Sequence, residues 1–115
     1  MAVELSGEEL SQAAAAVVSL KAEFYGRGPE EAKAFLNDNL LVIVLRGGFL
    51  DVEETLIERR REDVVRELRT TWEREVAADI SAAIERATGY HVADYHSQVL
   101  VATRTVVELF LLTAV

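Results

Sequence analysis

The stretch Leu40–Leu45, "LLVIVL", is apolar at every position and decides how the rest of the chain is expected to fold. A short run of this kind, rich in β-branched residues, is typical of a strand that is covered on both faces. Asp38 and Asn39 precede it as turn residues, and Glu31–Asn37 before them forms the partner strand. The sequence therefore predicts a β-hairpin whose second strand lies at the centre of the molecule.

A helix is predicted on the N-terminal side of this hairpin. Ser6 and Glu9 have the spacing of a capping box, and Leu5 with Leu10 has that of a hydrophobic staple. Gly26 then ends the helix in a position that favours glycine. One stripe at helical spacing faces the core: Leu10, Ala13, Ala14, Val17, Leu20, Lys21 and Phe24.

A second helical segment is predicted from Asp51, which with Glu54 offers a capping pair, to Thr88, because this segment lacks Gly and Pro. A continuous helix of ~37 residues would extend roughly 55 Å, more than a small domain is wide. Glu58–Asp63, "ERRRED", supplies no apolar residue for over a turn, so we expect a kink or a solvent-bridging turn there. The apolar stripe comprises Val65, Leu68, Trp72, Val76, Ile80, Ala83 and Ala87.

Gly89 ends this segment, and two further strands are predicted in Tyr90–Ala102 and Thr105–Thr113. The element order is then α-β-β-α-β-β. We predict a single domain over residues 1–115 of the α+β class, in which two long helices pack on a four-stranded antiparallel sheet.

A single layer of helices covers only one face of a sheet, so the doubly apolar strand needs a second layer or a second copy of the chain. Leu41 and Ile43 of that strand, together with Trp72 of the second helical segment, are the interface candidates. We therefore expect a homodimer or a higher homo-oligomer.

Composition narrows the class of partner. The 115 residues carry 12 Lys and Arg against 20 Asp and Glu, a formal net charge of −8 that disfavours nucleic acid. No cysteine is present, which excludes thiolate metal sites and disulfides and agrees with a cytoplasmic protein. The longest apolar run is far shorter than the ~18 residues of a membrane span, so no transmembrane segment is expected.

Two groups of side chains resemble sites but are better explained without a ligand. His91, Asp94 and His96 lie on a predicted strand, where residues five apart point to opposite faces unless a bulge intervenes, so no metal site is expected. Arg59–Arg61, with Arg66 and Arg69, is interleaved with acidic residues, and pairs such as Arg69 with Glu73 have the spacing of an exposed, solvated helix.

No arrangement of residues indicates a catalytic site. The sequence has no Ser-His-Asp order, no phosphate-binding P-loop and no dinucleotide fingerprint. We therefore predict no catalytic residues and no cofactor, and an enzyme is unsupported. Trp72, in the middle of the apolar stripe, is interpreted as a core or interface anchor rather than a platform for a ligand.

The turn Tyr25–Pro29, "YGRGP", admits two interpretations. Arg27, flanked by Gly26 and Gly28, could hold a small anion in a concavity of backbone N–H groups, which would make the protein an anion sensor or an enzyme. Alternatively, Gly26 closes the helix in a left-handed conformation, and Gly28 precedes the restrictive Pro29 where the chain turns into its first strand. The backbone requirements favour the second interpretation.

The block "YGRGPEEAKAFLNDNLLVIVLRGGF" resembles the opening of the MpsC-like family, in which a helix leads into a Tyr-Gly-Lys/Arg-Gly-Pro motif and a hairpin. Tyr25–Pro29 matches that motif, Leu45 and Gly47 match the step that ends the hairpin, and Thr88-Gly89 matches the end of the family's long charged helix. Ala102-Thr103-Arg104 departs from the family, which has a Gly-containing turn there.

The resemblance carries a functional implication. The family name ties it to a bacterial sodium-translocating, membrane-potential-generating system whose membrane components look like inorganic-carbon transporters. The resemblance implies a cytosolic accessory or regulatory protein that interacts with membrane transport proteins and is peripheral to the membrane through a partner. It brings no known catalytic residues to this chain.

Overall fold

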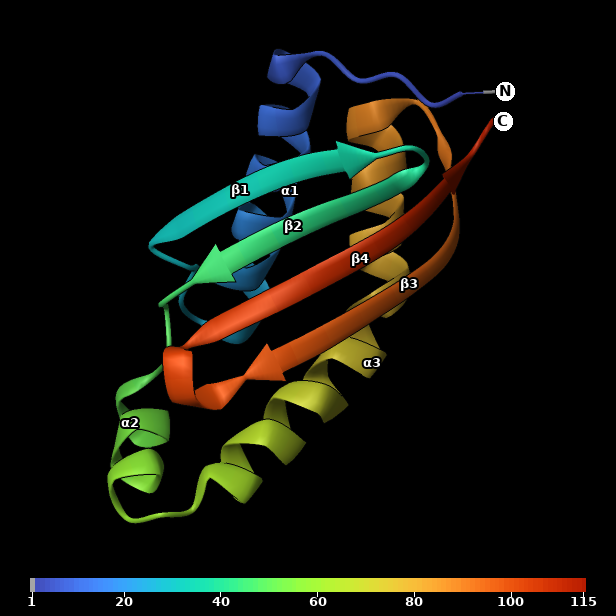
Figure 1. Cartoon of the computed structure of the whole chain (residues 1–115). Coiled ribbons are helices and arrows are strands. Elements are labelled where there is room, and N and C mark those ends of the chain that lie inside the picture. Colours follow the sequence, from blue (N-terminus) through green and yellow to red (C-terminus); the bar gives the residue numbers. More distant parts are fainter. Residues whose placement is uncertain (1) are drawn as a thin grey trace.

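The computed structural model describes residues 2–115, which form three α-helices, a short 3-10 helix and a four-stranded antiparallel sheet (Figure 1). The predicted α+β class and α-β-β-α-β-β order are confirmed, with the second helical segment divided in two. The elements are α1 (Gly7–Tyr25), β1 (Glu31–Asn37), β2 (Leu40–Arg46), α2 (Asp51–Glu58), α3 (Glu62–Thr88), β3 (His91–Leu100), η1 (Val101–Thr103) and β4 (Thr105–Thr113).

The strands are arranged in the order β1-β2-β4-β3, so the last strand of the chain lies inside the sheet beside β2. β2 pairs with β1 and β4, as expected for the strand that is apolar throughout. In the central row, Ile43 pairs with Ala34 on one side and with Glu108 on the other. Glu108 in turn pairs with Ser97 of β3, which places a carboxyl group in the middle of the sheet.

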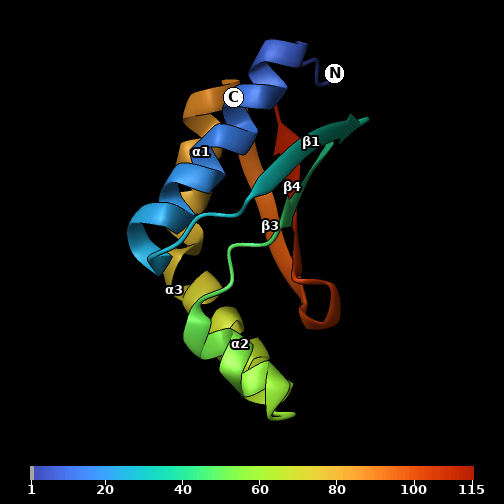
Figure 2. The ribbon, with the colours of Figure 1, turned by 90° about the vertical axis from the view of Figure 1, so that its left-hand side faces the viewer.

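Helices α1 and α3 lie on the same face of the sheet and leave the opposite face without a helix (Figure 2). The predicted capping box of α1 is present, with Ser6 and Glu9 bonded to each other's backbone N–H groups. Gly26 and Gly89 end α1 and α3 in the left-handed conformation, as predicted. Within residues 2–115, none of the helices combines the length and the apolar character that a bilayer crossing needs.

The predicted break at "ERRRED" is a reversal of direction, because α2 ends at Glu58 and α3 begins at Glu62 (Figure 1). Arg60 makes the turn with a φ of 60°, in the left-handed region. The predicted capping pair of α2, Asp51 with Glu54, is wrong. The N-cap residue is Leu50, and the backbone N–H group of Leu50 donates a hydrogen bond to Glu53. The molecule measures 48 × 23 × 22 Å, and α2 with the adjoining part of α3 extends beyond the sheet (Figure 2).

The turn between β3 and β4 holds Arg104 in the left-handed conformation at a φ of 51°, where glycine would be the easier residue. Its guanidinium donates hydrogen bonds to the carbonyl oxygens of Val101 and Ala102 and to both carboxylate oxygens of Glu54. These bonds connect the turn to α2 and explain how the hairpin closes without glycine.

One face of the sheet is covered by the helices, and the other face is not. Leu41, Ile43 and Leu45 of β2 are buried beneath the helices, whereas the residues between them are half-buried on the other side. The alternation continues across the paired strands, which gives the uncovered side a continuous apolar surface. We call this surface the open face; it comprises Phe35, Val42, Val44, Val107, Leu109 and Leu111.

Candidate functional site

Five ionisable side chains are buried between the helix layer and the sheet, although charged residues are rarely found there. They come from every helix and from strand β4: Lys21 of α1, Glu53 of α2, Arg69 and Glu73 of α3, and Glu108 of β4. Each is at most 5% exposed. The buried charges form two adjoining groups, which are described in turn.

The first group, which we call the carboxyl cluster, consists of Lys21, Glu73, Tyr95 and Glu108. The ammonium nitrogen of Lys21 is 2.5 Å from Glu73 Oε1 and 3.1 Å from Glu108 Oε1. The hydroxyl oxygen of Tyr95 is 2.7 Å from Glu73 Oε2 and 2.5 Å from Glu108 Oε2. The four side chains belong to α1, α3, β3 and β4, so the cluster connects the helix layer to the sheet.

The surroundings of the carboxyl cluster are largely apolar. The ring of Tyr95 stacks on Phe110 with ring centroids 4.9 Å apart, and Glu108 is fully buried. Burial raises the pKa of Glu108, and the neighbouring Lys21 only partly opposes this shift. Burial and the adjacent carboxyl groups also raise the pKa of Tyr95, so its hydroxyl stays protonated.

The second group, the arginine clamp, consists of Arg69, Glu53 and Tyr25. Arg69 binds Glu53 in a bidentate manner, with Nε 2.7 Å from Oε2 and Nη2 3.0 Å from Oε1. Tyr25 donates a hydrogen bond of 2.6 Å to Glu53 Oε2, and the guanidinium carbon of Arg69 lies 3.7 Å from the ring centroid of Phe49. The clamp therefore joins the start of α2 to α1 and α3.

The pKa values of the clamp follow from these contacts. Burial alone would raise the pKa of Glu53, but hydrogen bonds from Arg69, Tyr25 and the N–H group of Leu50 outweigh it and lower that pKa. Burial, and then the hydrogen bond to Glu53, raises the pKa of Tyr25. Glu53 is therefore a carboxylate at neutral pH and Tyr25 is a neutral phenol.

The contacts around Gly26, Arg27 and Gly28 favour the interpretation of this segment as a structural turn over its interpretation as an anion site. Arg27 donates a hydrogen bond of 2.8 Å to the carbonyl oxygen of Phe49, and its Nη1 is 3.6 Å from Asp51 Oδ1. The cavity beside this turn, lined by Lys21, Arg27 and Arg69 among others, measures about 10 Å³, which is room for roughly one water molecule. An anion site at Arg27 stays a prediction that these contacts do not favour.

The interface candidates Leu41, Ile43 and Trp72 stay a prediction, and each has neighbours within its own chain. Leu41 and Ile43 are fully buried on the helix-covered side of β2, so the surface that β2 leaves uncovered is formed by its alternate residues. Trp72 is half-buried against α1, with its ring 5.0 Å from that of Tyr25 and 5.1 Å from the ammonium nitrogen of Lys21. All three therefore make contacts within one chain.

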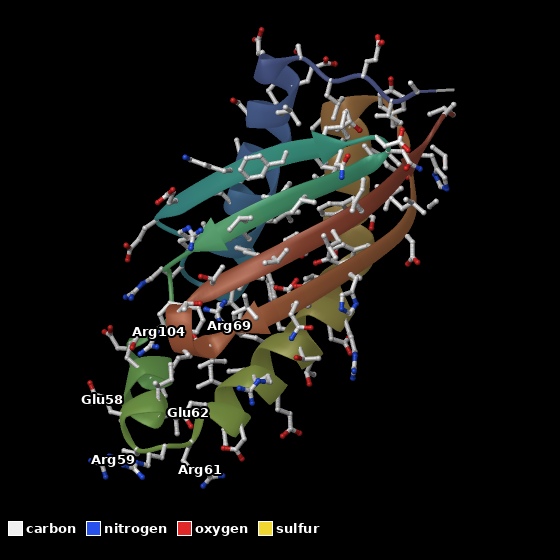
Figure 3. All side chains as sticks on the ribbon, in the orientation of Figure 1. Glu58, Arg59, Arg61, Glu62, Arg69 and Arg104 are labelled. Atoms are coloured by element: carbon white, nitrogen blue, oxygen red, sulfur yellow. The ribbon has the colours of Figure 1, made fainter. Side chains whose placement is uncertain are left out.

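The arginines between Arg59 and Arg69 lie in two different environments (Figure 3). Arg59 and Arg61 point away from the body at the turn between α2 and α3, in agreement with a solvated surface. Arg69 is instead buried, so its assignment to the solvated face is wrong. The expected Arg69–Glu73 pair is wrong as well, because Arg69 binds Glu53 and Glu73 binds Lys21. The turn of α3 that carries Arg69 faces α2, and this exposes Leu68 of the predicted apolar stripe.

The histidines are both exposed and have different neighbours. His91 Nδ1 lies 2.9 Å from Glu85 Oε2, whereas His96 is paired with Leu109 in the sheet. A bulge between Val92 and Asp94 interrupts the alternation that the sequence analysis assumed for this strand. Among residues 2–115, no group of three or more His, Asp or Glu side chains is placed to hold a metal ion.

The carboxyl cluster was not predicted from the sequence, although two signals pointed to it. Lys21 occupies a core position of the α1 stripe, and Glu108 occupies an inward position of β4 between Val106 and Phe110. A lysine and a glutamate at core positions of separate elements indicate a buried ion pair, because an unpaired charge is rarely buried. The third charged member, Glu73, gave no such signal, because it lay on a helix segment rich in both signs of charge.

Comparison with known families gives a match over residues 7–114, nearly the whole chain, to the family described as "MpsC: Na+-translocating membrane potential-generating system (MpsC)". The chain belongs to the MpsC family. This confirms the resemblance seen in the sequence. Comparisons with curated proteins and with solved structures give no match.

In this MpsC family member the segment "YGRGP" is built into the arginine clamp and its support. Tyr25 donates to Glu53, and Arg27 holds the carbonyl group of Phe49. A Cβ atom on Gly48 would lie 2.5 Å from the carbonyl oxygen of Gly28 and 2.7 Å from Pro29 Cα, so two glycine-containing turns pack backbone to backbone. The segment thus positions the start of α2 against α1.

Proposed function

We propose that this MpsC family member is a non-enzymatic accessory component of a Na+-translocating, membrane-potential-generating system. It acts by binding other proteins, lies on the cytoplasmic side, and reaches the membrane through a partner. Its membership in the family supports the link to that system. The acidic composition and the absence of cysteine agree with the cytoplasmic location.

The observation that carries the interaction role is the open face. Phe35 and Leu111 on this face are 52% and 39% exposed, and the side chains of β2 and β4 connect them into one apolar surface. Over the seven residues of β1 and β2, the four-stranded sheet has a footprint of roughly 20 by 23 Å, and the apolar side chains of the open face occupy the part formed by β1, β2 and β4. Exposed apolar patches of this size on monomers are often binding sites.

We assign the open face to a second copy of the chain. A two-fold axis along the strands places β1 of one copy over β3 of the other, which is a self-complementary arrangement. A standard interface buries ~800 Å² per partner, so an interface of this footprint is at the small end of specific protein–protein interfaces.

The buried charges support a structural role for the interior. Each buried cationic side chain has a carboxyl partner within 3.1 Å: Lys21 lies beside Glu73 and Glu108, and Arg69 pairs with Glu53. Groups engaged in this way hold the elements together and are not free to bind a substrate.

The test of the proposed role is capture of the membrane components of the system by the tagged protein, both from native membranes and after mild detergent extraction. We expect these components to be recovered with the wild-type chain. The membrane potential of vesicles that contain them should differ with and without the added protein. Recovery of none of these components under either condition, together with an unchanged potential, would remove the support for an accessory role.

A further inference from the structure

The hydroxyl group of Tyr95 lies between two carboxyl groups but has a single hydrogen to donate. Its oxygen is within hydrogen-bond distance of both Glu73 Oε2, at 2.7 Å, and Glu108 Oε2, at 2.5 Å. A phenol donates one hydrogen bond, so its proton can serve only one of these contacts. The other contact needs a hydrogen from a carboxyl group, because two oxygens at this separation are attractive only when a proton lies between them.

The count of buried charges leads to the same requirement. The buried side chains of residues 2–115 include two cations, Lys21 and Arg69, and three carboxyl groups, Glu53, Glu73 and Glu108. Arg69 and Glu53 neutralise each other in the arginine clamp. Lys21 can neutralise only one of the two remaining carboxylates, and a buried carboxylate without a counter-ion takes up a proton instead.

The geometry also selects the carboxyl group that carries the proton. Glu73 is the closer partner of Lys21, at 2.5 Å against 3.1 Å for Glu108. Glu108 is fully buried between Ile43 and Ser97 of the neighbouring strands, neither of which brings a charge. Glu108 is therefore the better placed of the two carboxyl groups to carry the proton, and Glu73 the better placed to pair with Lys21.

We propose that the carboxyl cluster is a proton-binding site, occupied by one proton at neutral pH. Glu108 Oε2 carries this proton and donates it to Tyr95 Oη, and the hydroxyl of Tyr95 donates its own hydrogen to Glu73 Oε2. The raised pKa of Glu108, caused by burial, agrees with this assignment.

The charged and titratable groups that face Glu108 are Lys21 from α1, Glu73 from α3 and Tyr95 from β3, while β2 presents Ile43. Glu73 and Tyr95 also line a cleft of about 240 Å³ between α3 and β3, through which the proton can pass to water. His96 and Arg74 lie in the wall of the same cleft and do not contact Glu108. Release of the proton leaves two carboxylates opposite one ammonium group between the helix layer and the sheet.

The site has a definite consequence for stability. Glu108 has a higher pKa in the folded chain than its ordinary value of 4.5, so folding favours its protonated form. The resulting stabilisation is complete below about pH 4.5 and is lost as the pH rises toward the pKa of the folded state. Over that range the unfolding equilibrium constant should rise by up to about tenfold per pH unit, because unfolding releases one proton.

The first experiment uses the wild-type chain. Urea unfolding is followed between about pH 5 and about pH 9 through the fluorescence of Trp72, the only tryptophan, which lies beside Lys21. Infrared spectroscopy of the folded protein at neutral pH should show the carbonyl stretch of a protonated carboxyl group. The absence of both the pH dependence and this absorption would overturn the proposal without the use of any variant.

Three variants assign the proton to the cluster. Glu108→Gln keeps the shape and the donor toward Tyr95, so it should fold but lose both the infrared absorption and the tenfold slope. Glu73→Gln leaves Lys21 free to pair with ionised Glu108, and both signals should again disappear. Glu75→Gln, at an exposed position of the same helix, should retain them. Persistence of both signals in Glu108→Gln would overturn the proposal.

Discussion

Arg69 is the side chain on which the junction of α1, α2 and α3 depends. Its guanidinium group fills the space beside Phe49 and Tyr25 and meets both oxygens of Glu53. Glu53 is fully buried, so its carboxylate has no access to water if the arginine is removed. Breaking a buried ion pair from one side is much more harmful than replacing both partners, because an uncompensated charge is left behind.

We therefore predict that Arg69→Met lowers the free energy of unfolding by about 3–5 kcal/mol. The measurement is urea unfolding followed by the fluorescence of Trp72. Arg66→Met is the matched control, because Arg66 is exposed on the same helix, and it should change stability by less than about 0.5 kcal/mol. The double variant Glu53→Leu with Arg69→Met should recover part of the loss. Equal effects of Arg69→Met and Arg66→Met would show that the clamp is not a stabilising contact.

At the scale of elements, the connection from β2 to α2 is determined by the close approach of two turns. Gly48 has a φ of 77°, and its α-carbon faces the backbone of Gly28 and Pro29, where a side chain has no room. Gly89 ends α3 with a similar φ of 76°, but nothing lies within 4 Å of the position that a Cβ atom would take. The two glycines therefore share a backbone conformation and differ in their neighbours.

Comparing substitutions of Gly48 and Gly89 tests whether the close approach of the two turns determines the connection from β2 to α2. Gly89→Ala should cost about 1–2 kcal/mol of stability, the usual penalty of a side chain in the left-handed conformation. Gly48→Ala should cost a further ~1–3 kcal/mol, because the added methyl group forces the two turns apart. Thermal and urea unfolding of both variants would measure the difference. Similar losses in the two variants would mean that the turns can separate freely.

For the whole molecule, the decisive feature is that the helices cover one face of the sheet and leave the other apolar. If the chain forms the proposed homodimer, we predict that Leu111→Lys on the open face converts it to a monomer without unfolding it. Leu68→Lys is the matched control, because Leu68 is 46% exposed on α3, away from the sheet, compared with 39% for Leu111. Light scattering and sedimentation at micromolar concentration would report the mass. A wild-type chain that is monomeric there would contradict the assignment of the open face.

The local structure of this protein could be read from its sequence because each feature depends on neighbouring residues. The capping box at Ser6, the helix ends at Gly26 and Gly89, and the hairpin around Asp38 and Asn39 all have signals within a few residues. The break between α2 and α3 was visible as a gap in the apolar stripe. The MpsC family could be recognised from a short motif in the same way.

The candidate site could be predicted only in part, because its members are far apart in the sequence and come together only in the folded chain. Lys21 and Glu73 are 52 residues apart, and Tyr95 and Glu108 are joined by the pairing of β3 with β4. The pairing of the buried charges depends on how α3 is rotated about its axis relative to the sheet. No pattern within a short stretch of sequence determines that rotation. For the same reason, the side of β2 that faces the helices had to be seen in the structure.

The sequence by itself thus determined the elements, their order and the family, since these follow from short-range periodicity and turn chemistry. The tertiary structure alone decided that β4 is inserted beside β2, that Arg69 lies inside, and that a carboxyl group occupies the centre of the sheet. The physical reason is that burial of a charge is favourable only when distant residues supply its partner, and those partners come together only when the layers pack.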